Sequence, residues 1–568
     1  MRNQDILAVY QQWLSDPAID EETKTELRSL ESRPEEIEDR FYRELTFGTG
    51  GLRGVIGAGT NRMNRYTVGK ATQGLASYVK RIAGEGVVPS VVIAHDSRRC
   101  SPEFALDAAL VLAGNGVRAY VFESLRPTPE LSFAVRHLKA NAGIVITASH
   151  NPPEYNGYKV YGPHGGQLVP HEADEVIGDI AKVSSFSEIR RLSRAEAEER
   201  GLLVWIGEEV DEAYINAVVS VSQRPEAIAA AGEELKIIYT PLHGTGYMPV
   251  TRALEKAGFK NVRIVEEQAK PDGNFPTVKS PNPEEREAFT LALEIAKREG
   301  ADLIIGTDPD ADRMGAVVAD PDGNYVVLTG NQSGAIMIEY LLSSLKERGQ
   351  LPQNGAVVKT IVTSEMGAEI ARNYGAKVFD TLTGFKYIGE LMTKFERTGD
   401  HTFLFGYEES YGYLAGNYAR DKDAIVASLL IAEAAAYYKS QGKTLYDVLL
   451  ALYEKYGYYL ERLESRTLKG KDGLERIGQI MERFRHAAPQ TVAGVPVKQV
   501  KDYLPGIDGL PAENVLKFFL EDGSWFCLRP SGTEPKIKIY FAVCGTSLDD
   551  SRLRIEKLAN EVMAAVDA

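Results

Sequence analysis

The 568-residue chain contains few cysteines, no long apolar run and no excess of positive charge. Its three cysteines are scattered and odd in number, so they match neither a disulfide framework nor a zinc-binding spacing. No segment reaches the ~18 apolar residues of a membrane span, and the N-terminal residues lack the apolar core of a signal peptide. The net charge of −15 argues against non-specific binding to nucleic acid or membranes, although local positive pockets are compatible with it. We therefore expect a cytoplasmic protein without nucleic-acid or membrane partners.

The order of helical and apolar patterns predicts α/β units. A chain of this length is too long for one hydrophobic core, and roughly three to four domains are expected. Helical patterns near 67–84 and 102–115 alternate with apolar strands at 91–94 and 119–122, which favours a parallel α/β layer. A charged, interrupted stretch over 183–210 predicts a linker helix and a domain boundary near residue 205.

The rest of the chain predicts two further α/β units and a last unit of another type. After about residue 457 a strand, a helix, a hairpin-like pair and a C-terminal helix follow one another, which is typical of an α+β domain. Ser547 with Asp550 forms a plausible cap for the final helix. The predicted domains are 1–205, 206–322, 323–456 and 457–568.

The most informative stretch is 143–159, where a buried strand is followed at once by polar residues. Residues 142–146 are apolar and largely β-branched, which predicts a short buried strand. Ser149 and His150 follow it, and the proline pair at 152–153 forbids a helix there. A serine held on a stiff turn after a buried strand is well placed for covalent chemistry, but an ordinary serine and asparagine turn explains the same residues.

Three aspartates, Asp308, Asp310 and Asp312, follow the strand predicted over 301–306. Carboxylates this close repel one another unless a cation lies between them, and hard oxygen ligands suit Mg²⁺ or Ca²⁺. An EF-hand is excluded, because the sixth position is Arg313 rather than glycine and a strand precedes the loop. A solvated acidic turn is the alternative, but the neighbouring arginine favours a cation site that handles phosphate.

Three other loops combine small and charged residues. Glycines surround Arg53 over 47–54, and glycine allows the backbone to approach a ligand closely. The segment 529–533 offers a guanidinium, two hydroxyls and a glycine, which suits an oxyanion or a phosphate. The segment 406–410 offers carboxylates and a hydroxyl, which suit sugar hydroxyls. Taken singly, each is equally explained as a glycine-rich loop, a hairpin turn or a charged surface.

Two more polar segments follow predicted strands. Asp96 and Arg98 lie at the end of one strand, where a structural ion pair explains them better than a catalytic role. The run 240–246, Thr-Pro-Leu-His-Gly-Thr-Gly, follows the strand over 236–239 and precedes a helix. Composition alone assigns no chemistry to either segment.

Taken together, four of these loops resemble the functional loops of the α-D-phosphohexomutase superfamily, in the same order along the chain. The segments are 147–152 for its phosphoserine loop, 308–313 for its metal loop, 406–410 for its sugar-binding loop and 529–535 for its phosphate-binding loop. Within the superfamily, 47–54 and 383–386 are similar to the long bacterial phosphoglucomutase/phosphomannomutase branch. The resemblance covers nearly the whole chain and implies a heart-shaped, four-domain protein with three related α/β domains and a C-terminal α+β domain.

The resemblance also implies a role for each matching residue. Ser149 would carry a phosphoryl group, the two arginines would stabilise it during transfer, and His150 and Lys159 would be proton-transfer or charge partners. The implied catalytic residues are Ser149, His150, Lys159, Arg53 and Arg313. The implied ligands of Mg²⁺ are Ser149, Asp308, Asp310 and Asp312. The implied substrate-binding residues are Thr383, Gly384, Lys386, Glu408, Ser410, Arg529, Ser531, Gly532 and Thr533.

The activity implied by the resemblance is that of a phosphoglucomutase, an isomerase that works through a phosphoserine and glucose 1,6-bisphosphate, as a monomer or homodimer. Phosphomannomutase activity, alone or in addition, and phosphopentomutase activity are alternatives. A non-catalytic sugar-phosphate sensor and a phosphatase with aspartate nucleophiles are alternatives of other classes. The tyrosines at 407, 411 and 413 depart from the commoner form of the sugar-binding loop, so the preferred sugar is open.

Overall fold

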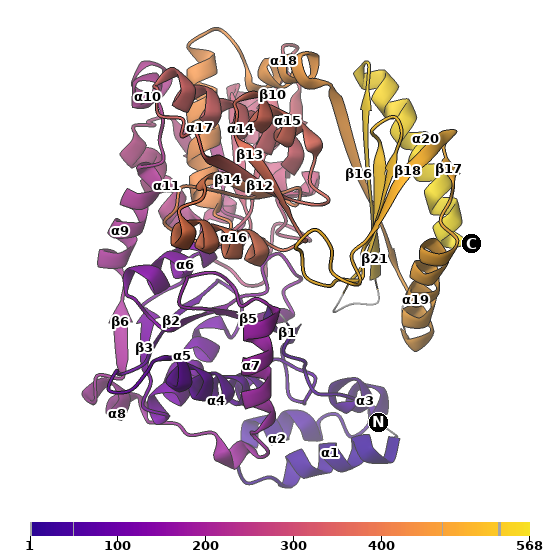
Figure 1. The fold of residues 1–568 in the computed structure, drawn as a ribbon. Helices are drawn as coiled ribbons and strands as arrows, with labels where there is room; N and C mark the ends of the chain where they lie inside the picture. The colour runs from indigo at the N-terminus through magenta and orange to yellow at the C-terminus, as the bar shows by residue number, and fades with distance from the viewer. Residues whose placement is uncertain (1–2, 49, 469, 532–535) are drawn as a thin grey trace.

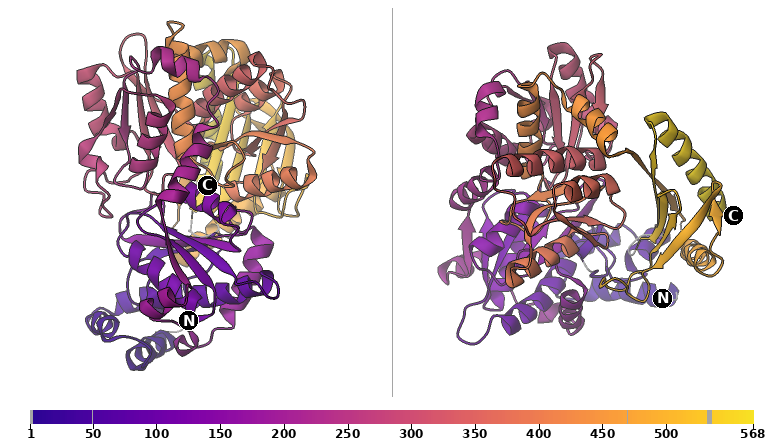
Figure 2. Two further views of the ribbon diagram at one scale, coloured as in Figure 1. Left: turned by 90° about the vertical axis from the view of Figure 1, so that its left-hand side faces the viewer. Right: turned by 45° about the horizontal axis from the view of Figure 1, so that its top comes forward.

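The structure is a computed structural model that describes residues 3–48, 50–468, 470–531 and 536–568. Figure 1 shows four units, each built on one sheet, and the C-terminal unit stands beside the others. The turned views in Figure 2 show the first unit at one end of the molecule and the fourth on one flank. Among the described helices, none is both long and apolar enough to cross a membrane.

The first unit is a mixed sheet that follows three short N-terminal helices. Its elements are α1 (Asn3–Ser15), α2 (Glu21–Arg28), α3 (Pro34–Phe41), β1 (Gly51–Val55), α4 (Arg65–Ile82), β2 (Ser90–His95), α5 (Ser101–Gly114), β3 (Arg118–Phe122), α6 (Thr128–His137), β4 (Ala142–Ile146), β5 (Tyr155–Tyr161), α7 (Pro170–Ala181), η1 (Phe186–Glu188), α8 (Arg194–Glu199) and β6 (Leu203–Ile206). The strand order is β1-β5-β4-β2-β3-β6. Strand β2 runs parallel to β3 and β4, whereas β5 is antiparallel to β1 and β4.

Helices cover both faces of this sheet, and the composition of β2 shows why. Val91 and Ile93 are buried in one hydrophobic cluster, with residues of α4 and α5. Val92 and Ala94 are buried in another, with residues of α6. A strand buried on both faces has no polar face, so its sequence is a continuous apolar run. The parallel layer predicted over 66–145 is confirmed.

The stretch 183–210 differs from the predicted linker helix. Within it η1 and α8 are short, α9 begins only at Glu208, and β6 between α8 and α9 pairs in parallel with β3 as the edge strand of the first sheet. Part of the charge lies on the exposed surface of α8, whose N-terminus is capped by the Ser193 side chain. The stretch therefore contains a short solvated helix and an edge strand instead of one linker helix, and the boundary near residue 205 stays a prediction.

The second unit carries the aspartate loop at the end of a central strand. Its elements are α9 (Glu208–Val219), α10 (Pro225–Ala231), β7 (Ile237–Thr240), α11 (Tyr247–Ala257), β8 (Val262–Ile264), α12 (Glu266–Ala269), η2 (Arg286–Phe289), α13 (Thr290–Glu299), β9 (Leu303–Thr307), β10 (Met314–Ala319) and β11 (Tyr325–Val327). The strand order is β11-β10-β9-β7-β8. Strands β7, β8 and β9 are parallel, and β10 returns antiparallel to β9, so the loop 308–313 connects two neighbouring strands.

The third unit has a four-stranded sheet in the order β13-β12-β14-β15. Its elements are α14 (Gly330–Glu347), β12 (Gly355–Thr360), α15 (Glu365–Asn373), β13 (Lys377–Thr381), α16 (Phe385–Thr398), β14 (Thr402–Glu408), β15 (Gly412–Ala415), α17 (Ala424–Lys439) and α18 (Leu445–Tyr456). Helix α17 is apolar on all sides, and it contacts α10 and α11 of the second unit as well as α14 of its own. A helix of this composition is stable in water only when it is buried all round.

The fourth unit is an antiparallel sheet with two helices, as predicted. Its elements are β16 (Tyr458–Thr467), α19 (Gly470–His486), β17 (Thr491–Val492), β18 (Val495–Asp502), β19 (Leu516–Leu520), β20 (Trp525–Pro530), β21 (Lys536–Gly545) and α20 (Leu548–Asp567). The strand order is β16-β21-β20-β19-β18-β17. The predicted cap of the last helix is confirmed, because the Ser547 hydroxyl accepts a hydrogen bond from the backbone N–H of Asp550 at 3.1 Å.

Candidate active site

The serine loop follows β4 and brings Ser149 to the aspartate loop of the second unit. The Ser149 hydroxyl donates a hydrogen bond of 2.8 Å to Oδ2 of Asp308. Its Oγ also lies 3.3 Å from Nδ1 of His150, and its backbone N–H donates to the Thr147 hydroxyl at 2.9 Å. Ser149 is buried and has a φ of 52°, in the left-handed region that few non-glycine residues adopt. Two loops about 160 positions apart therefore meet at one hydroxyl.

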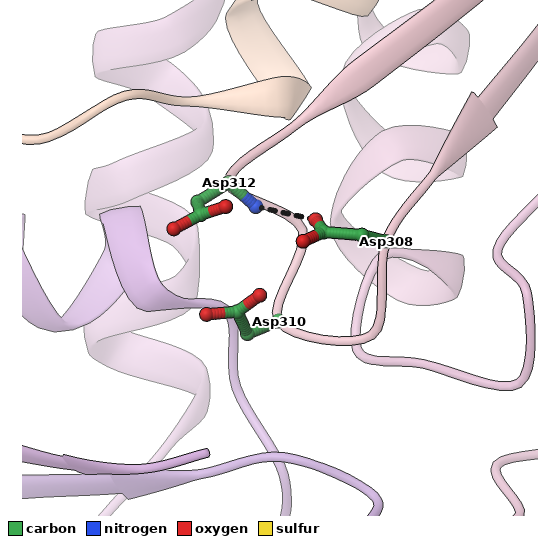
Figure 3. Close-up of side chains that lie close together, drawn as sticks. All are labelled: Asp308, Asp310 and Asp312. Carbon is green, nitrogen blue, oxygen red and sulfur yellow. Dashed lines mark hydrogen bonds between the residues drawn. The ribbon is translucent and has the colours of Figure 1, made fainter. Parts of the chain in front are cut away.

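The three aspartates form a compact group of buried carboxylates. One carboxylate oxygen from each lies within 4.8 Å of the other two, and Figure 3 shows the side chains converging from one loop. The loop is closed by backbone N–H groups of Asp312 and Arg313, which donate to Oδ1 of Asp308 at 3.2 and 3.0 Å. Within the described residues, Oδ1 of Asp310 and Oδ1 of Asp312 are buried and accept no hydrogen bond. Buried oxygens without a donor fit a hard cation such as Mg²⁺.

Two lysines supply positive charge to this group. Nζ of Lys159 lies 2.8 Å from Asp310 and 3.5 Å from Asp312, and Nζ of Lys422 lies 2.9 Å from Asp312. Burial alone would lower the pKa of both lysines, but the nearby carboxylates outweigh it and raise the pKa of each. Asp308 differs, because burial and the repulsion of the other two aspartates raise its pKa well above the usual value. A bound cation would therefore favour the ionised form of Asp308 more than that of the other two carboxylates.

The two predicted arginines come from different domains and bond to different loops. Arg313 donates to Oε1 of Glu284 at 2.8 Å and to the backbone carbonyl of Ser410 at 3.1 Å. Arg53 is exposed and donates to Oδ1 of Asn151 at 3.1 Å. Burial, together with these two arginines, lowers the pKa of His150 well below its usual value. His150 is therefore neutral at physiological pH.

Four of the predicted sugar-binding residues, Thr383, Gly384, Lys386 and Glu408, lie at the start of α16. Oε1 of the buried Glu408 accepts a hydrogen bond of 2.9 Å from the backbone N–H of Gly384. Gly384 has a φ of 124°, which glycine adopts more readily than other residues. The Thr383 hydroxyl is buried and makes no hydrogen bond with the described residues. Burial lowers the pKa of Lys386. The charge of Arg529 also lowers it, whereas the charge of Glu408 raises it.

The phosphate-binding segment lies on the fourth unit. Nε of Arg529 at the end of β20 donates to Oε1 of Glu513 at 3.1 Å. The Ser531 backbone N–H donates to the carbonyl of Lys536 at 2.7 Å. Gly532 and Thr533 lie outside the described residues. Lys538 stands opposite Arg529 on the neighbouring strand, and burial with the repulsion of Arg529 lowers its pKa.

Two of the three tyrosines that depart from the commoner form of the sugar-binding loop have a structural explanation. The Tyr407 side chain fills the space beside Gly334 and Gly367, where an added Cβ atom would lie 2.4 Å from its ring and 2.2 Å from its hydroxyl oxygen. The buried Tyr413 ring stacks on Tyr407, and its hydroxyl donates to the Gly330 carbonyl at 3.2 Å. Both side chains therefore belong to the core of the third unit, and the departure from the commoner loop is compensated by glycines around it.

Two residues that contact the carboxylates were missed from the sequence. Lys422 lies in the charged run 420–423 directly before the apolar helix α17, and that contrast was the available signal. Thr128 donates from its hydroxyl to Oδ2 of Asp310 at 2.8 Å and from its backbone N–H to the Asp310 carbonyl at 2.9 Å. No local pattern marks Thr128, because its partner is 182 positions away.

Comparison with known proteins agrees with this geometry. The chain matches family models described as phosphoglucomutase/phosphomannomutase α/β/α domain I over 44–186, domain II over 212–323, domain III over 329–456, and the C-terminal domain over 481–554. The phosphoglucomutase of Staphylococcus haemolyticus is 39% identical over 518 residues, which cover 89% of this chain and 91% of that protein.

Solved structures show the same fold. A putative phosphomannomutase from Thermus thermophilus has a TM-score of 0.69 at 24% identity and covers 93% of this chain and 100% of its own. The open form of a phosphoglucomutase from Paramecium also has a TM-score of 0.69, at 17% identity, and covers 93% of this chain and 95% of its own. With all four domains matched in order, the chain belongs to the phosphoglucomutase/phosphomannomutase family and is a mutase with three α/β domains and a C-terminal α+β domain.

Proposed function

We propose that this mutase interconverts glucose 1-phosphate and glucose 6-phosphate through a phosphoserine at Ser149. The observation that carries the proposal is the hydrogen bond of 2.8 Å between the Ser149 hydroxyl and Asp308, which joins a nucleophile to a buried carboxylate group. Relatives named phosphoglucomutase at 37–39% identity favour glucose phosphates over other substrates.

The charges around Ser149 suit a phosphoryl carrier. A phosphoserine carries roughly −1.5 to −2 charges, and the incoming sugar phosphate is also anionic. Lys159, Arg53 and Arg313 would offset this repulsion in a protein that is acidic overall. Mg²⁺ held by Asp308, Asp310, Asp312 and an oxygen of the phosphoserine would stabilise the charge of the phosphoryl group as a Lewis acid.

In the proposed reaction, a hydroxyl oxygen of the sugar attacks the phosphorus of phospho-Ser149, and the bond from phosphorus to Oγ breaks. The attacking hydroxyl loses one proton, and Oγ of the released serine gains one. The neutral His150, whose Nδ1 lies 3.3 Å from Oγ, can pass a proton, whereas Lys159 stays charged through its ion pairs. Glucose 1,6-bisphosphate then turns round and returns its other phosphate to Ser149, so it serves as both intermediate and activator.

The third and fourth domains would hold the sugar. Glu408, Ser410, Thr383, Gly384 and Lys386 would bind its hydroxyls, because Glu408 bonds to Gly384 at the start of α16 and the Ser410 carbonyl bonds to Arg313. The segment 529–533 would hold the phosphate that is not transferred, with Arg529, Ser531, Gly532 and Thr533 as donors. The proposal keeps the division into 1–205, 206–322, 323–456 and 457–568, with β6 at the first boundary, and a cytoplasmic monomer or homodimer.

A comparison of three substrates tests this function. We expect kcat/KM to be highest for glucose 1-phosphate, lower for mannose 1-phosphate and lowest for ribose 1-phosphate, with Mg²⁺ and a trace of glucose 1,6-bisphosphate present. The intact mass of the purified protein should show one added phosphoryl group that maps to Ser149. A preference for ribose 1-phosphate would assign the chain to phosphopentomutases, and no turnover with an unmodified serine would favour the sensor.

A further inference from the structure

The carbonyl groups of the serine loop converge on one buried arginine, Arg98, which projects from the end of β2. Nη1 of Arg98 donates to the carbonyls of Pro152 and Tyr155 at 2.8 and 3.1 Å. Nη2 donates to the carbonyls of Ser149 and Asn151 at 2.6 and 2.5 Å. Arg98 is only 1% exposed, so these bonds form away from water. One side chain therefore holds the backbone of the loop at four points.

The four hydrogen bonds from Arg98 are important because Ser149 has an uncommon backbone conformation. Its φ of 52° lies in the left-handed region, which is unfavourable for a residue with a Cβ atom and persists only when neighbouring groups hold it. The Ser149 carbonyl is fixed by Arg98, and its N–H is fixed by the Thr147 hydroxyl. Between these two anchors, the Ser149 side chain is directed toward Asp308.

The guanidinium is itself held from two domains. Its Nε lies 3.4 Å from Oδ2 of Asp96, which is also buried. The ring of Phe275, from the second domain, lies 5.1 Å from the guanidinium carbon, within the range of a cation–π contact. The nearby Gly273 has no space for a side chain, because an added Cβ atom would lie 2.6 Å from the backbone nitrogen of Arg99.

The same part of the second domain also contacts the metal loop. The Thr245 backbone N–H donates to the Pro309 carbonyl at 2.8 Å, and an added Cβ atom at Gly244 would lie 2.4 Å from Pro309. The carbonyl of His243 accepts from the backbone N–H of Asp272, which joins this run to the turn that carries Phe275. The segments 243–245 and 272–275 therefore touch both the metal loop and the support of the serine loop.

We propose that Arg98 is a positioning residue that sets the Ser149 hydroxyl against the metal loop, and that Phe275 links this position to the second domain. The inference rests on the proposed role of Ser149 as phosphoryl carrier. Among the described residues, every hydrogen bond of the guanidinium goes to a backbone carbonyl. Arg98 thus acts through the loop and not on the phosphoryl group.

The main test is Arg98→Lys, assayed with glucose 1-phosphate. Lysine keeps the charge, but its three N–H groups on one nitrogen cannot reproduce the planar fork that spans four carbonyls. We expect kcat to fall about 100-fold, because a displacement of about 1 Å of a reacting group has an effect of that size. KM should stay within about twofold, because the sugar and its distal phosphate bind to other domains.

Arg224→Lys is the matched control. Arg224 is also largely buried and stacks on an aromatic ring, with its guanidinium carbon 4.2 Å from the centre of the Tyr437 ring, but it lies between α9 and α10. Arg224→Lys should lower the thermal midpoint about as much as Arg98→Lys does and leave kcat unchanged.

Phe275→Leu, which keeps all four hydrogen bonds of Arg98, should lower kcat by roughly three- to tenfold with little change in KM.

The outcomes separate the inference from the function on which it rests. If Arg98→Lys lowers only the thermal midpoint, or raises KM at constant kcat, the positioning role is wrong. If Arg98→Lys does not fold, Phe275→Leu decides, and a kcat equal to that of the wild type overturns the inference. If the wild-type protein has no phosphoserine and turns over none of the three sugar phosphates, the proposed function fails instead.

Discussion

The centre around Ser149 and the three aspartates and the junction between the third and fourth domains are built in different ways. At the centre, Asp308 accepts hydrogen bonds from the Ser149 hydroxyl and from two backbone N–H groups, and charged partners surround the other two aspartates. The junction is mainly apolar, with Ile361, Val362 and Leu382 of the third domain against residues of β20 and β21. The buried ammonium of Lys517 crosses it and donates to the Ile361 carbonyl at 2.5 Å.

This difference fits two separate demands of the proposed reaction. Ion pairs and hydrogen bonds are directional, so a network of them fixes the reacting atoms. Apolar contacts are non-directional, so a domain that is held by them can shift by small steps without breaking a network. The bisphosphate has to be bound in two orientations. This requires that the domain that binds the non-transferred phosphate can move. A rigid centre and an adjustable junction meet these demands together.

Removing the serine hydroxyl has the largest expected effect on the rigid centre. In Ser149→Ala no phosphoryl carrier is left, so kcat should fall on the order of 10⁴-fold or more. The intact mass should show no added phosphoryl group, and the thermal midpoint should change little. Ser440→Ala is the control, because that exposed hydroxyl caps the end of α17 through the Tyr437 carbonyl. Phosphate release that survives in Ser149→Ala would favour the phosphatase alternative.

Removing one ammonium tests whether the centre depends on charge balance. Lys159→Met leaves the buried carboxylate of Asp310 without its closest cation, and the free energy of unfolding should fall by about 3–5 kcal/mol in the presence of a chelator. Mg²⁺ should restore more stability to the variant than it adds to the wild type, because a second cation then supplies the missing charge. Urea unfolding with and without Mg²⁺ measures both effects.

Lys182→Met provides the comparison for that experiment. Lys182 pairs with Asp179 at 2.7 Å, but its side chain is 76% exposed, so its loss should lower the free energy of unfolding by at most about 1 kcal/mol. An equal loss in both variants, or no response of Lys159→Met to Mg²⁺, would show that the carboxylate group is not a cation site.

A pH series probes the adjustable junction. Burial, together with repulsion from Lys359, lowers the pKa of Lys517 from 10.5 to about 8. Between pH 8 and 10.5 the unfolded chain then binds more protons than the folded one, so stability from this group rises with pH across that window. The rise amounts to about 3 kcal/mol at most. Lys517→Met should remove it, and equal slopes for the two proteins in urea unfolding from pH 8 to 10 would contradict the assignment.

Much of the fold and of the candidate site could be predicted because the relevant signals are local. The strand before Ser149 and the strand before Asp308 are continuous apolar runs, and each ends where polar residues begin. The three aspartates stand within five positions of one another, so their mutual repulsion could be inferred without a structure. The order of the loops along the chain then indicated the family, which the comparisons confirmed.

The parts that could not be predicted depend on contacts between distant segments. Arg98 bonds to carbonyl groups about 50 positions away, and a backbone carbonyl leaves no mark in the sequence. From the sequence, Tyr407 was interpreted as a change in the sugar-binding loop. In the structure, glycines elsewhere in the third domain make space for its ring in the core. The linker helix predicted over 183–210 was wrong because α8 is short and charged on its exposed surface, while β6 owes its place to pairing with β3.

Strand β6 also limits how this protein can be divided or recombined with its relatives. A cut at residue 205 falls inside β6, which pairs with β3, and only Gly207 separates β6 from α9. Helix α9 contacts α6 of the first domain as well as α11 and α17 beyond it. A fragment that ended before β6 would expose the edge of β3, and an exposed edge strand promotes association with other chains. The smallest piece that could be exchanged intact between family members therefore includes the whole of β6, through Ile206.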